Sequence, residues 1–578
     1  MTVKVLLLCL DDDANITATS VPVLLDLGTD ITTASRTLKT ELETSKSTFA
    51  FFCLDRTIWR DAKTIMIEQL RARFDYDWKQ WTGGKLQTVI DYNPDHDNEE
   101  LVHLLAIFAG EFKRLPPRDW LSELPSGKYF SARPPKARAT DAEPAEFAKG
   151  QRNENTRIIC DRPRDPLHIP IPIALLVSSF GTFQTNTRTI KPSDRAFQFA
   201  KKMSDGLCVI YSDESQRERA FCQLLGEFLN MDINKVQIGD YTTVGAVLYV
   251  LNGQNGASSI IVEVKVEQCG TKGDPGFQFS LNYLENARLV RSHAAGGNEK
   301  ALRWIKSRLP SILITHAGLS IQIFGGVMVD RPQVEVLTAS VPIFFHASHE
   351  DMFLDLARTL TALHVLFIDI DKVYSTPPEH SFQVQHSFPY PRSFEQGNET
   401  VFFTYIRWVD PTRFVFEIKT QQDIVLYVKY ARRHSEETHR KVHQLGLAPK
   451  LLVCHELEGG WKMIVMEPIP EGYEAADDII SRRTKATLPR EDIKYMVREA
   501  LEPFFAEGYV HGDLRSANIY IHVDKRKVLM IDFDWSGRDG KVNYPPNIRS
   551  NSRIWRPEAE LSLRFIELKH DREMVEHL

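Results

Sequence analysis

The residues best placed to do chemistry lie in H-G-D-L-R-S-A-N, residues 511–518, and in V-L-M-I-D-F-D, residues 528–534. Phosphoryl transfer requires a carboxylate that orients the attacking hydroxyl, and oxygen ligands that hold Mg²⁺ against a triphosphate. Asp513 fits the first role, and Asn518 and Asp532 fit the second. Asp513 and Asp532 are 19 residues apart, with short apolar strands between them. We therefore expect ATP and Mg²⁺ as cofactors, because this spacing disfavours the alternative of a surface hairpin with acidic ends.

The same chemistry predicts roles for residues around these motifs. We expect Arg515 to take part in catalysis and His511 to support the loop structurally. Upstream, the apolar strand D-I-V-L-Y-V-K-Y carries Lys429 near its end. An ammonium in that position grips the α- and β-phosphates of a nucleotide. Glu437, or its neighbour Glu436, follows in a charged stretch and is available to orient this lysine.

Two further elements must position the nucleotide and the loop. The strand W-K-M-I-V-M-E-P ends at Met466 and Glu467, which we expect to form a hinge against the adenine. A helix is predicted from near Pro489, a residue suited to a first helical turn. Its apolar residues recur at helical spacing: Ile493, Val497, Ala500, Leu501 and Phe504. This helix leads directly into the 511–518 motif.

Three features depart from an ordinary protein kinase. No G-x-G-x-x-G loop precedes Lys429, so phosphate cover must come from another β-hairpin. The magnesium motif reads D-F-D, residues 532–534, instead of D-F-G. Only 44 residues follow Asp534, without A-P-E, which predicts a reduced C-terminal lobe.

A second strand in the middle of the chain also has chemical potential. In S-S-I-I-V-E-V-K-V-E, residues 258–267, strand alternation places Glu263, Lys265 and Glu267 on one face. Carboxylates bind a hard cation, and a lysine beside them can lie near an attacked phosphodiester. The alternative is an antiparallel strand with a solvated face, which produces the same alternation.

The bulk composition excludes several classes of protein. Hydrophobic residues make up 43% and charged residues 26%, and the net charge is -6, so no overall basic field favours nucleic acid. Seven cysteines occur without C-x-x-C pairing, which predicts reduced thiols and no zinc site. No apolar run approaches the ~20 residues that cross a bilayer, and no classical signal peptide is visible.

A chain of 578 residues is too long for one core. Residues 131–157 and 375–398 have the Ala-, Pro- and charge-rich or Pro-rich composition of linkers. We therefore expect domains at 1–130, 158–374 and 380–578. The first of them opens as strand, turn and strand, followed by a possible helix at 37–43, an α+β beginning.

The C-terminal segments resemble the fungal kinase-like domains called FunK1, which occur in Crinkler proteins. The matching stretches are V-K-Y-A-R-R, G-L-A-P-K-L-L, H-G-D-L-R-S-A-N-I, I-D-F-D-W-S-G, N-Y-P-P-N-I, I-W-R-P and H-D-R-E-M. The resemblance covers residues 385–578. It implies a bilobal, atypical kinase of the serine/threonine type, with a protein or a small-molecule hydroxyl as the phosphate acceptor.

The middle segments resemble the restriction-endonuclease-like PD-(D/E)xK domains of Crinkler proteins. The resemblance rests on the E-V-K strand and on the helix after it, which carries Gln278 and Tyr283. It implies an α/β nuclease-like site made of Glu218, Glu263, Lys265 and Gln278, and a possible DNA contact. Where the family has Asp before Gly, this chain has Val244, so cleavage is in doubt; Asp240 substitutes only if its loop bends.

The first segment resembles a Crinkler header with a ubiquitin-like fold, through D-W-L (119–121), Y-F (129–130) and R-I-I-C-D-R-P (157–163). The whole is expected to be an α+β multidomain effector, secreted into a host cell and possibly its nucleus, with a cytoplasmic location as the alternative. ATP-dependent phosphotransfer is the expected activity. The alternatives are a Mg²⁺-dependent, DNA-directed nuclease toxin regulated by the kinase-like domain, and a binding-only effector with both sites degenerate.

Overall fold

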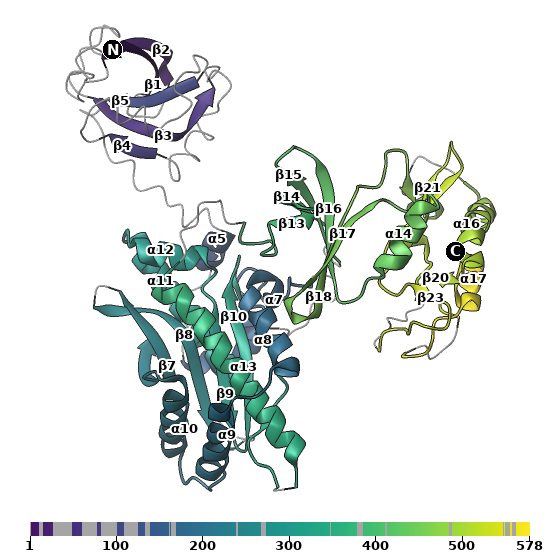
Figure 1. The fold of residues 1–578 in the computed structure, drawn as a ribbon. Helices are drawn as coiled ribbons and strands as arrows, with labels where there is room; N and C mark the ends of the chain where they lie inside the picture. The colour runs from purple at the N-terminus through teal and green to yellow at the C-terminus, as the bar shows by residue number, and fades with distance from the viewer. Residues whose placement is uncertain are drawn as a thin grey trace. The chain divides into compact units, whose positions relative to one another are not determined.

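The computed structural model shows a mixed α+β, multidomain protein (Figure 1). The chain divides into two compact units, Met1–Trp120 and Leu121–Leu578. The structure describes residues 2–10, 16–26, 49–59, 78–81, 101–108, 125–132, 139–160, 162, 169–238, 241–251, 253–267, 273–346, 348–377, 385–410, 413–484, 488–546, 548, 555–557 and 562–578.

The first unit contains a five-stranded sheet in the order β2-β1-β5-β3-β4. β1 pairs with β2 in antiparallel fashion and with β5 in parallel fashion. The two strands of the expected opening are therefore confirmed, whereas the turn between them, the expected helix at 37–43 and the D-W-L stretch lie outside the described residues. The strands are β1 (Thr2–Leu10), β2 (Ile16–Asp26), β3 (Phe49–Trp59), β4 (Trp78–Trp81) and β5 (Leu101–Phe108).

A seven-stranded sheet forms the middle of the chain, in the order β11-β10-β9-β8-β7-β6, with β12 beside β10. β6, β7 and β8 form an antiparallel meander, α11 follows, and β9 returns parallel to β8. The strands are β6 (Asn234–Ile238), β7 (Tyr241–Leu251), β8 (Gln254–Lys265), β9 (Ser311–Ala317), β10 (Ser320–Met328), β11 (Pro332–Val336) and β12 (Val341–Pro342).

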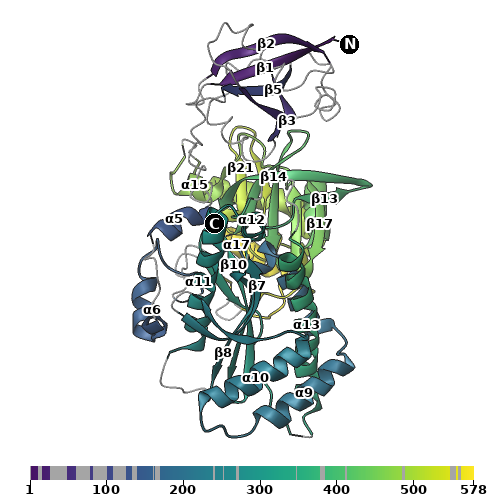
Figure 2. The same cartoon turned by 90° about the vertical axis from the view of Figure 1, so that its left-hand side faces the viewer.

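Helices cover this sheet, and α9 and α10 lie side by side (Figure 2). Residues 214–229 form α10, whose N-cap Asp213 accepts a hydrogen bond from the backbone of Gln216. α11 begins at Pro275 after the N-cap Asp274, as its Asp-Pro start predicts. The helices are α7 (Ile173–Leu176), α8 (Ser178–Thr189), α9 (Asp194–Leu207), α10 (Glu214–Leu229), α11 (Pro275–Ala295), α12 (Glu299–Lys306) and α13 (Glu350–Ser375).

Two expectations about this part are wrong. Residues 131–157 are not an extended linker, because they contain the 3₁₀ helix η3 (Ala139–Ala142) and α6 (Pro144–Gln151), after α5 (Pro125–Ala132). Phe147 of α6 stacks on Phe277 with ring centroids 4.0 Å apart, which ties the segment to α11. In addition, β8 has no solvated face at its centre, since Glu263 is fully buried and Lys265 nearly so.

The C-terminal part begins with a six-stranded sheet in the order β13-β14-β15-β16-β18-β17. The expected strands around Lys429 and before Met466 are confirmed as β16 and β18. This sheet contains β13 (Ser393–Gln396), β14 (Glu399–Asp410), β15 (Phe414–Thr420), β16 (Val425–Ala431), β17 (Leu451–Leu457) and β18 (Trp461–Met466), with helix α14 (Glu436–Gln444) after β16.

A small, mainly helical lobe follows. The predicted helix near Pro489 is confirmed as α16, with Pro489 as its N-cap. Its buried Ile493, Val497 and Leu501 pack in one core with the hairpin β21–β22 and the last helix. The elements are β19 (Glu474–Ala475), α15 (Ala476–Ile480), α16 (Arg490–Ala506), β20 (Tyr509–Val510), η5 (Ser516–Asn518), β21 (Ile519–His522), β22 (Lys527–Met530), β23 (Gly537–Arg538) and α17 (Leu568–Glu576). None of the helices that the structure describes has the length and apolar character of a membrane span.

Candidate functional site

The two sequence motifs and Lys429 meet between the six-stranded sheet and the helical lobe. Lys429 projects from β16, and its Nζ lies 2.5 Å from Oδ1 of Asp532 and 2.5 Å from Oδ1 of Asp534. Asp532 has a φ of 73°, a left-handed conformation that is uncommon outside glycine and is characteristic of functional sites. Sequence reasoning therefore identified residues that the fold brings together.

Burial and charge oppose each other at this pair. Burial disfavours both charged forms, but the neighbouring charges outweigh it. Lys429 and Arg413 hold the pKa of Asp532 below its ordinary value. Conversely, Asp532 and Asp534 raise the pKa of Lys429 despite its burial. The pair is therefore ionised at neutral pH.

Asp513 lies in the loop between β20 and η5 and is almost fully buried. Its Oδ1 accepts a hydrogen bond of 2.7 Å from Nη1 of Arg556, and its Oδ2 lies 3.1 Å from Nε of Arg515. Nδ2 of Asn518 donates to the same Oδ2 and to the backbone carbonyl of Asp513, both at 2.9 Å. These contacts fix the direction of the Asp513 carboxylate.

A fourth cation, Arg413, enters the site from the hairpin between β14 and β15. Its Nη2 donates to Oδ1 of Asn518 at 3.0 Å, and its Nη1 lies 3.2 Å from Oδ2 of Asp532. One guanidinium thus contacts both of the residues expected to bind Mg²⁺. Because the sequence has no glycine-rich loop, another β-hairpin must cover the phosphates of the nucleotide. The hairpin that carries Arg413 lies where such a cover is expected.

The residues present fit a magnesium–nucleotide complex. The amide oxygen of Asn518 and a carboxylate oxygen of Asp532 are hard donors, and a single cation already reaches both. The ammonium of Lys429 is adjacent and suits phosphate oxygens. Among the residues that the structure describes, no three His, Cys, Asp or Glu side chains form a preformed metal cluster. The site thus offers two protein ligands, as a Mg²⁺ shared with phosphates requires.

The 511–518 loop is anchored by a residue far along the chain. Asp571 of α17 accepts hydrogen bonds from the backbone N–H groups of His511, at 2.5 Å, and Gly512, at 2.8 Å. Burial raises the pKa of Asp571 to about 7, although these two donors oppose the shift. Gly512 has a φ of 80°, and a Cβ there would approach Ile566 and Trp535, which explains glycine after His511.

His511, for which we expect a structural role, is buried and bonds the backbone on both sides. Its Nε2 donates to the carbonyl of Ile531 at 3.0 Å, and its Nδ1 accepts from the backbone N–H of Asp513 at 3.2 Å. Burial lowers the pKa of His511, so the ring is neutral and can make both bonds. Phe533 packs against the His511 ring and stacks on His439 of α14, with centroids 4.5 Å apart.

The expected pairing of Lys429 with a helix carboxylate is not formed. Glu437 is exposed and accepts hydrogen bonds from Tyr509 and Arg538, which lower its pKa. Glu436 accepts from Arg440 one turn later. The charged sequence was compatible with either glutamate, but both belong to the first turn of α14 and bond other partners.

The expected hinge residues end β18. Met466 is half-buried beside Ala431 and Leu451, and the backbone N–H of Glu467 donates to the carbonyl of Lys450. They lie at the junction between the six-stranded sheet and the helical lobe, where a hinge was predicted.

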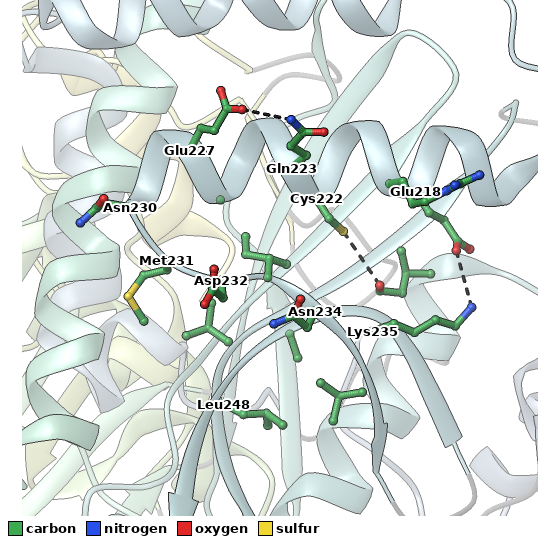
Figure 3. Close-up of a pocket in the computed structure, with 17 residues that line it drawn as sticks. Glu218, Cys222, Gln223, Glu227, Asn230, Met231, Asp232, Asn234, Lys235 and Leu248 are labelled. Carbon is green, nitrogen blue, oxygen red and sulfur yellow. Dashed lines mark hydrogen bonds and ion pairs between the residues drawn. The ribbon is translucent and has the colours of Figure 1, made fainter.

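The expected nuclease-like residues lie around β8 but do not share one cavity. A cavity of about 1040 Å³ between α10 and the β6–β7 hairpin is lined by Glu218 and Val244, among others, but not by Glu263, Lys265 or Gln278 (Figure 3). Within it, Oε2 of Glu218 lies 3.7 Å from Nζ of Lys235 on β6. Asp240 lies outside the described residues.

Glu263 and Lys265 have unexpected partners. Lys265 pairs with Glu214 of α10 at 3.0 Å, and Nδ2 of Asn282 donates to Oε1 of Glu263 at 2.5 Å. Oε2 of Glu263 is buried without a hydrogen-bond partner. Burial raises the pKa of Glu263 well above its ordinary value, and Glu218 adds to the shift although Lys265 opposes it. The helix residue that contacts Glu263 is therefore Asn282, one turn after Gln278.

Sequence reasoning missed Arg413, Arg556, Asp571 and Asn282. I-W-R-P and H-D-R-E-M were noticed as stretches, and they contain Arg556 and Asp571. No local pattern assigned a role to these residues, because each acts on a partner that is distant in sequence. Arg413 could have been found by asking which hairpin replaces the missing glycine-rich loop.

No protein-family model matches the chain, and no curated protein matches it significantly. Among solved structures, the kinase PK-1 of Cydia pomonella granulovirus is similar at 17% identity, over 24% of this chain and 53% of the viral chain, with a TM-score of 0.20. The match thus spans about half of the viral kinase. A likeness at this TM-score does not establish a shared fold.

Proposed function

We propose that residues 380–578 form an atypical, ATP-dependent kinase that transfers a phosphoryl group to a hydroxyl of the serine/threonine type or of a small molecule. The observation that carries this proposal is the convergence of Lys429, Asp513, Asn518 and Asp532 from three separate segments. A chance set of acidic loop ends does not bring a buried lysine to the same point. Resemblance of the surrounding motifs to FunK1 domains supports the same chemistry.

The chain's own residues divide the task. Asp513 directs its carboxylate toward the acceptor hydroxyl and receives its proton as the bond to phosphorus forms. Lys429 binds phosphate oxygens, and Asn518 and Asp532 provide the ligands for a metal ion. When bound, Mg²⁺–ATP supplies the phosphoryl group and offsets the charge of the triphosphate. Arg413 must release Asn518 and Asp532 for this, since its guanidinium contacts the same two oxygens.

The test is phosphoryl transfer from labelled ATP by the full chain. Asp513→Ala and Asp532→Ala are expected to reduce transfer by about 10³-fold or more, since each removes a reacting or metal-binding carboxylate. Glu263→Gln, in the middle sheet, is the matched control and should leave transfer unchanged. Thermal unfolding must show that the variants fold. Wild-type turnover in either Ala variant would reject the proposal.

We propose a restriction-endonuclease-like fold for the middle sheet. Its order of α10, an antiparallel β6–β7–β8 meander, α11 and a parallel β9 supports this. A cleaving site is disfavoured, because Val244 supplies no side-chain oxygen and burial raises the pKa of Glu263 well above its ordinary value. For the first unit, the parallel β1–β5 pair inside the order β2-β1-β5-β3-β4 supports a ubiquitin-like header. Delivery into a host cell as an effector is proposed from the Crinkler resemblance.

A further inference from the structure

Lys429 has two carboxylate partners, but a metal ion competes for one of them. Asp532 provides an oxygen for Mg²⁺ in the proposed function, and its carboxylate cannot neutralise Lys429 to the same extent once the metal is bound. Lys429 is only 6% exposed. A buried ammonium without a counter-ion is costly, so a second carboxylate must stay with it.

Helix α14 does not supply that carboxylate. The helix begins at Glu436, and its N-cap Ser435 uses its side chain to accept from the backbone of Thr438. The two glutamates of its first turn bond Arg440, Tyr509 and Arg538. The Lys429 partner must therefore come from another segment.

Asp534 meets the requirement. Its Oδ1 lies 2.5 Å from Nζ of Lys429, and its side chain is about one-quarter exposed. It follows Phe533, which is fixed between the rings of His439 and His511. The backbone carbonyl of Phe533 also accepts from Ser435 at 3.0 Å. Asp534 is thus held in place by its chain neighbour.

The histidine beside Asp534 does not compete for this role. Nε2 of His439 faces the carbonyl of Pro449 and must donate, so its Nδ1 accepts from Nε2 of His434. Burial lowers the pKa of both rings, which keeps them neutral. Nδ1 of neutral His434 is then a lone pair, 3.5 Å from Asp534, and cannot donate. Lys429 is the donor that Asp534 has.

We propose that Asp534, the third residue of D-F-D, is the positioning residue that orients Lys429 toward nucleotide phosphates, in place of a glutamate on α14. This inference rests on the proposed kinase function. It explains why the chain has a carboxylate at a position where D-F-G motifs have none. It also explains why the glutamates of α14 are free to bond elsewhere.

The test compares Asp534→Asn, Asp534→Glu and the control Glu437→Gln in the full chain. Asp534→Asn should lower kcat/KM for ATP about 100-fold, because Lys429 loses its alignment. Asp534→Glu keeps the charge and should recover at least part of that loss. Glu437→Gln should stay within about twofold of wild type, since Glu437 contacts neither Lys429 nor the loop. Thermal unfolding checks that each variant folds.

A magnesium titration separates positioning from metal binding. If Asp534 positions Lys429, excess Mg²⁺ should not restore Asp534→Asn; restoration would show a metal ligand and overturn the inference. Turnover of Asp534→Asn within about threefold of wild type would overturn it as well, while leaving the kinase proposal intact. A wild-type chain without transfer would instead reject the kinase proposal.

Discussion

In two regions of this molecule, a lysine on a buried strand lies beside carboxylates. The two regions differ in the number of cations that surround those carboxylates. In the C-terminal site, Lys429 and Arg413 surround Asp532, and Arg515 and Arg556 surround Asp513. In the middle sheet, Lys265 pairs with Glu214 at the edge, and Glu263 receives one amide hydrogen bond.

Asp532 and Glu263 are both buried, so the number of nearby cations determines the direction in which the pKa of each carboxyl group shifts. The pKa of Asp532 lies below its ordinary value, and the pKa of Glu263 lies well above its ordinary value. A carboxylate must be ionised to bind a metal ion. The comparison therefore supports the proposed function, because nearby cations favour the charged form of Asp532 and burial disfavours that of Glu263.

The largest expected difference is between the two lysines. Lys429→Arg keeps the positive charge but replaces the compact ammonium group by a planar guanidinium group. The larger group does not fit between Asp532 and Asp534. Transfer from labelled ATP should fall about 100-fold or more. Lys265→Arg is the matched change in the middle sheet and should leave transfer unaffected. Equal turnover of Lys429→Arg and wild type would mean that β16 does not contact the nucleotide.

The next difference concerns stability. Asp532→Asn tolerates the positive φ but leaves Lys429 and Arg413 short of one negative charge. It should destabilise the C-terminal part by about 2–3 kcal/mol. Burial already disfavours the charged form of Glu263, so Glu263→Gln should cost about 1 kcal/mol or less. Thermal unfolding of both variants at pH 7 measures this. A larger loss in Glu263→Gln would show that Glu263 is ionised.

Burial raises the pKa of Asp571, and the resulting pH dependence of stability has a definite sign. Its folded pKa of about 7 lies above the ordinary value of 3.8. Its contribution to stability is complete below pH ~4 and is lost as the pH rises toward 7, since only the unfolded chain releases the proton. The slope is at most ~1.4 kcal/mol per pH unit.

Thermal unfolding between pH 5 and pH 7 should show that slope in wild type. Asp571→Asn cannot titrate and should flatten it, whereas Asp524→Asn, at an exposed position of the same lobe, should not. An unchanged slope in Asp571→Asn would assign the pH dependence to other groups.

The smallest expected effect is a gain of activity in the middle sheet. Gly245 pairs with Val262, and the next residues along the two strands are Val244 and Glu263. Val244→Asp adds a carboxylate there and should produce weak Mg²⁺-dependent DNA cleavage, while Asp240→Ala should change little. Robust cleavage by the unmodified chain that depends on Asp240 would instead show that the missing ligand has been replaced.

The sequence was sufficient to predict those elements and site residues that depend on short-range patterns along the chain. The spacing from Asp513 to Asp532, the strand before Lys429 and the helix after Pro489 follow from short-range patterns, and the structure contains the elements that they predict. Glu437 could not be assigned correctly, because the choice among partners on α14 depends on Tyr509 and Arg538, which are distant in sequence.

Residues 131–157 were misjudged for a related reason. Their composition is that of a linker, but Phe147 finds a partner on α11 that no local pattern shows. The burial of Glu263 depends likewise on strands and helices that pack around β8, while alternation along one strand describes only that strand.

The anchoring of the 511–518 loop by Asp571 also sets an order of events during synthesis. The loop leaves the ribosome about fifty residues before the helix that holds its backbone. At ~5–20 residues per second, this delay is on the order of several seconds. During that time the N–H groups of His511 and Gly512 lack the carboxylate that fixes them. The nascent chain therefore cannot complete the 511–518 loop until α17 has been made.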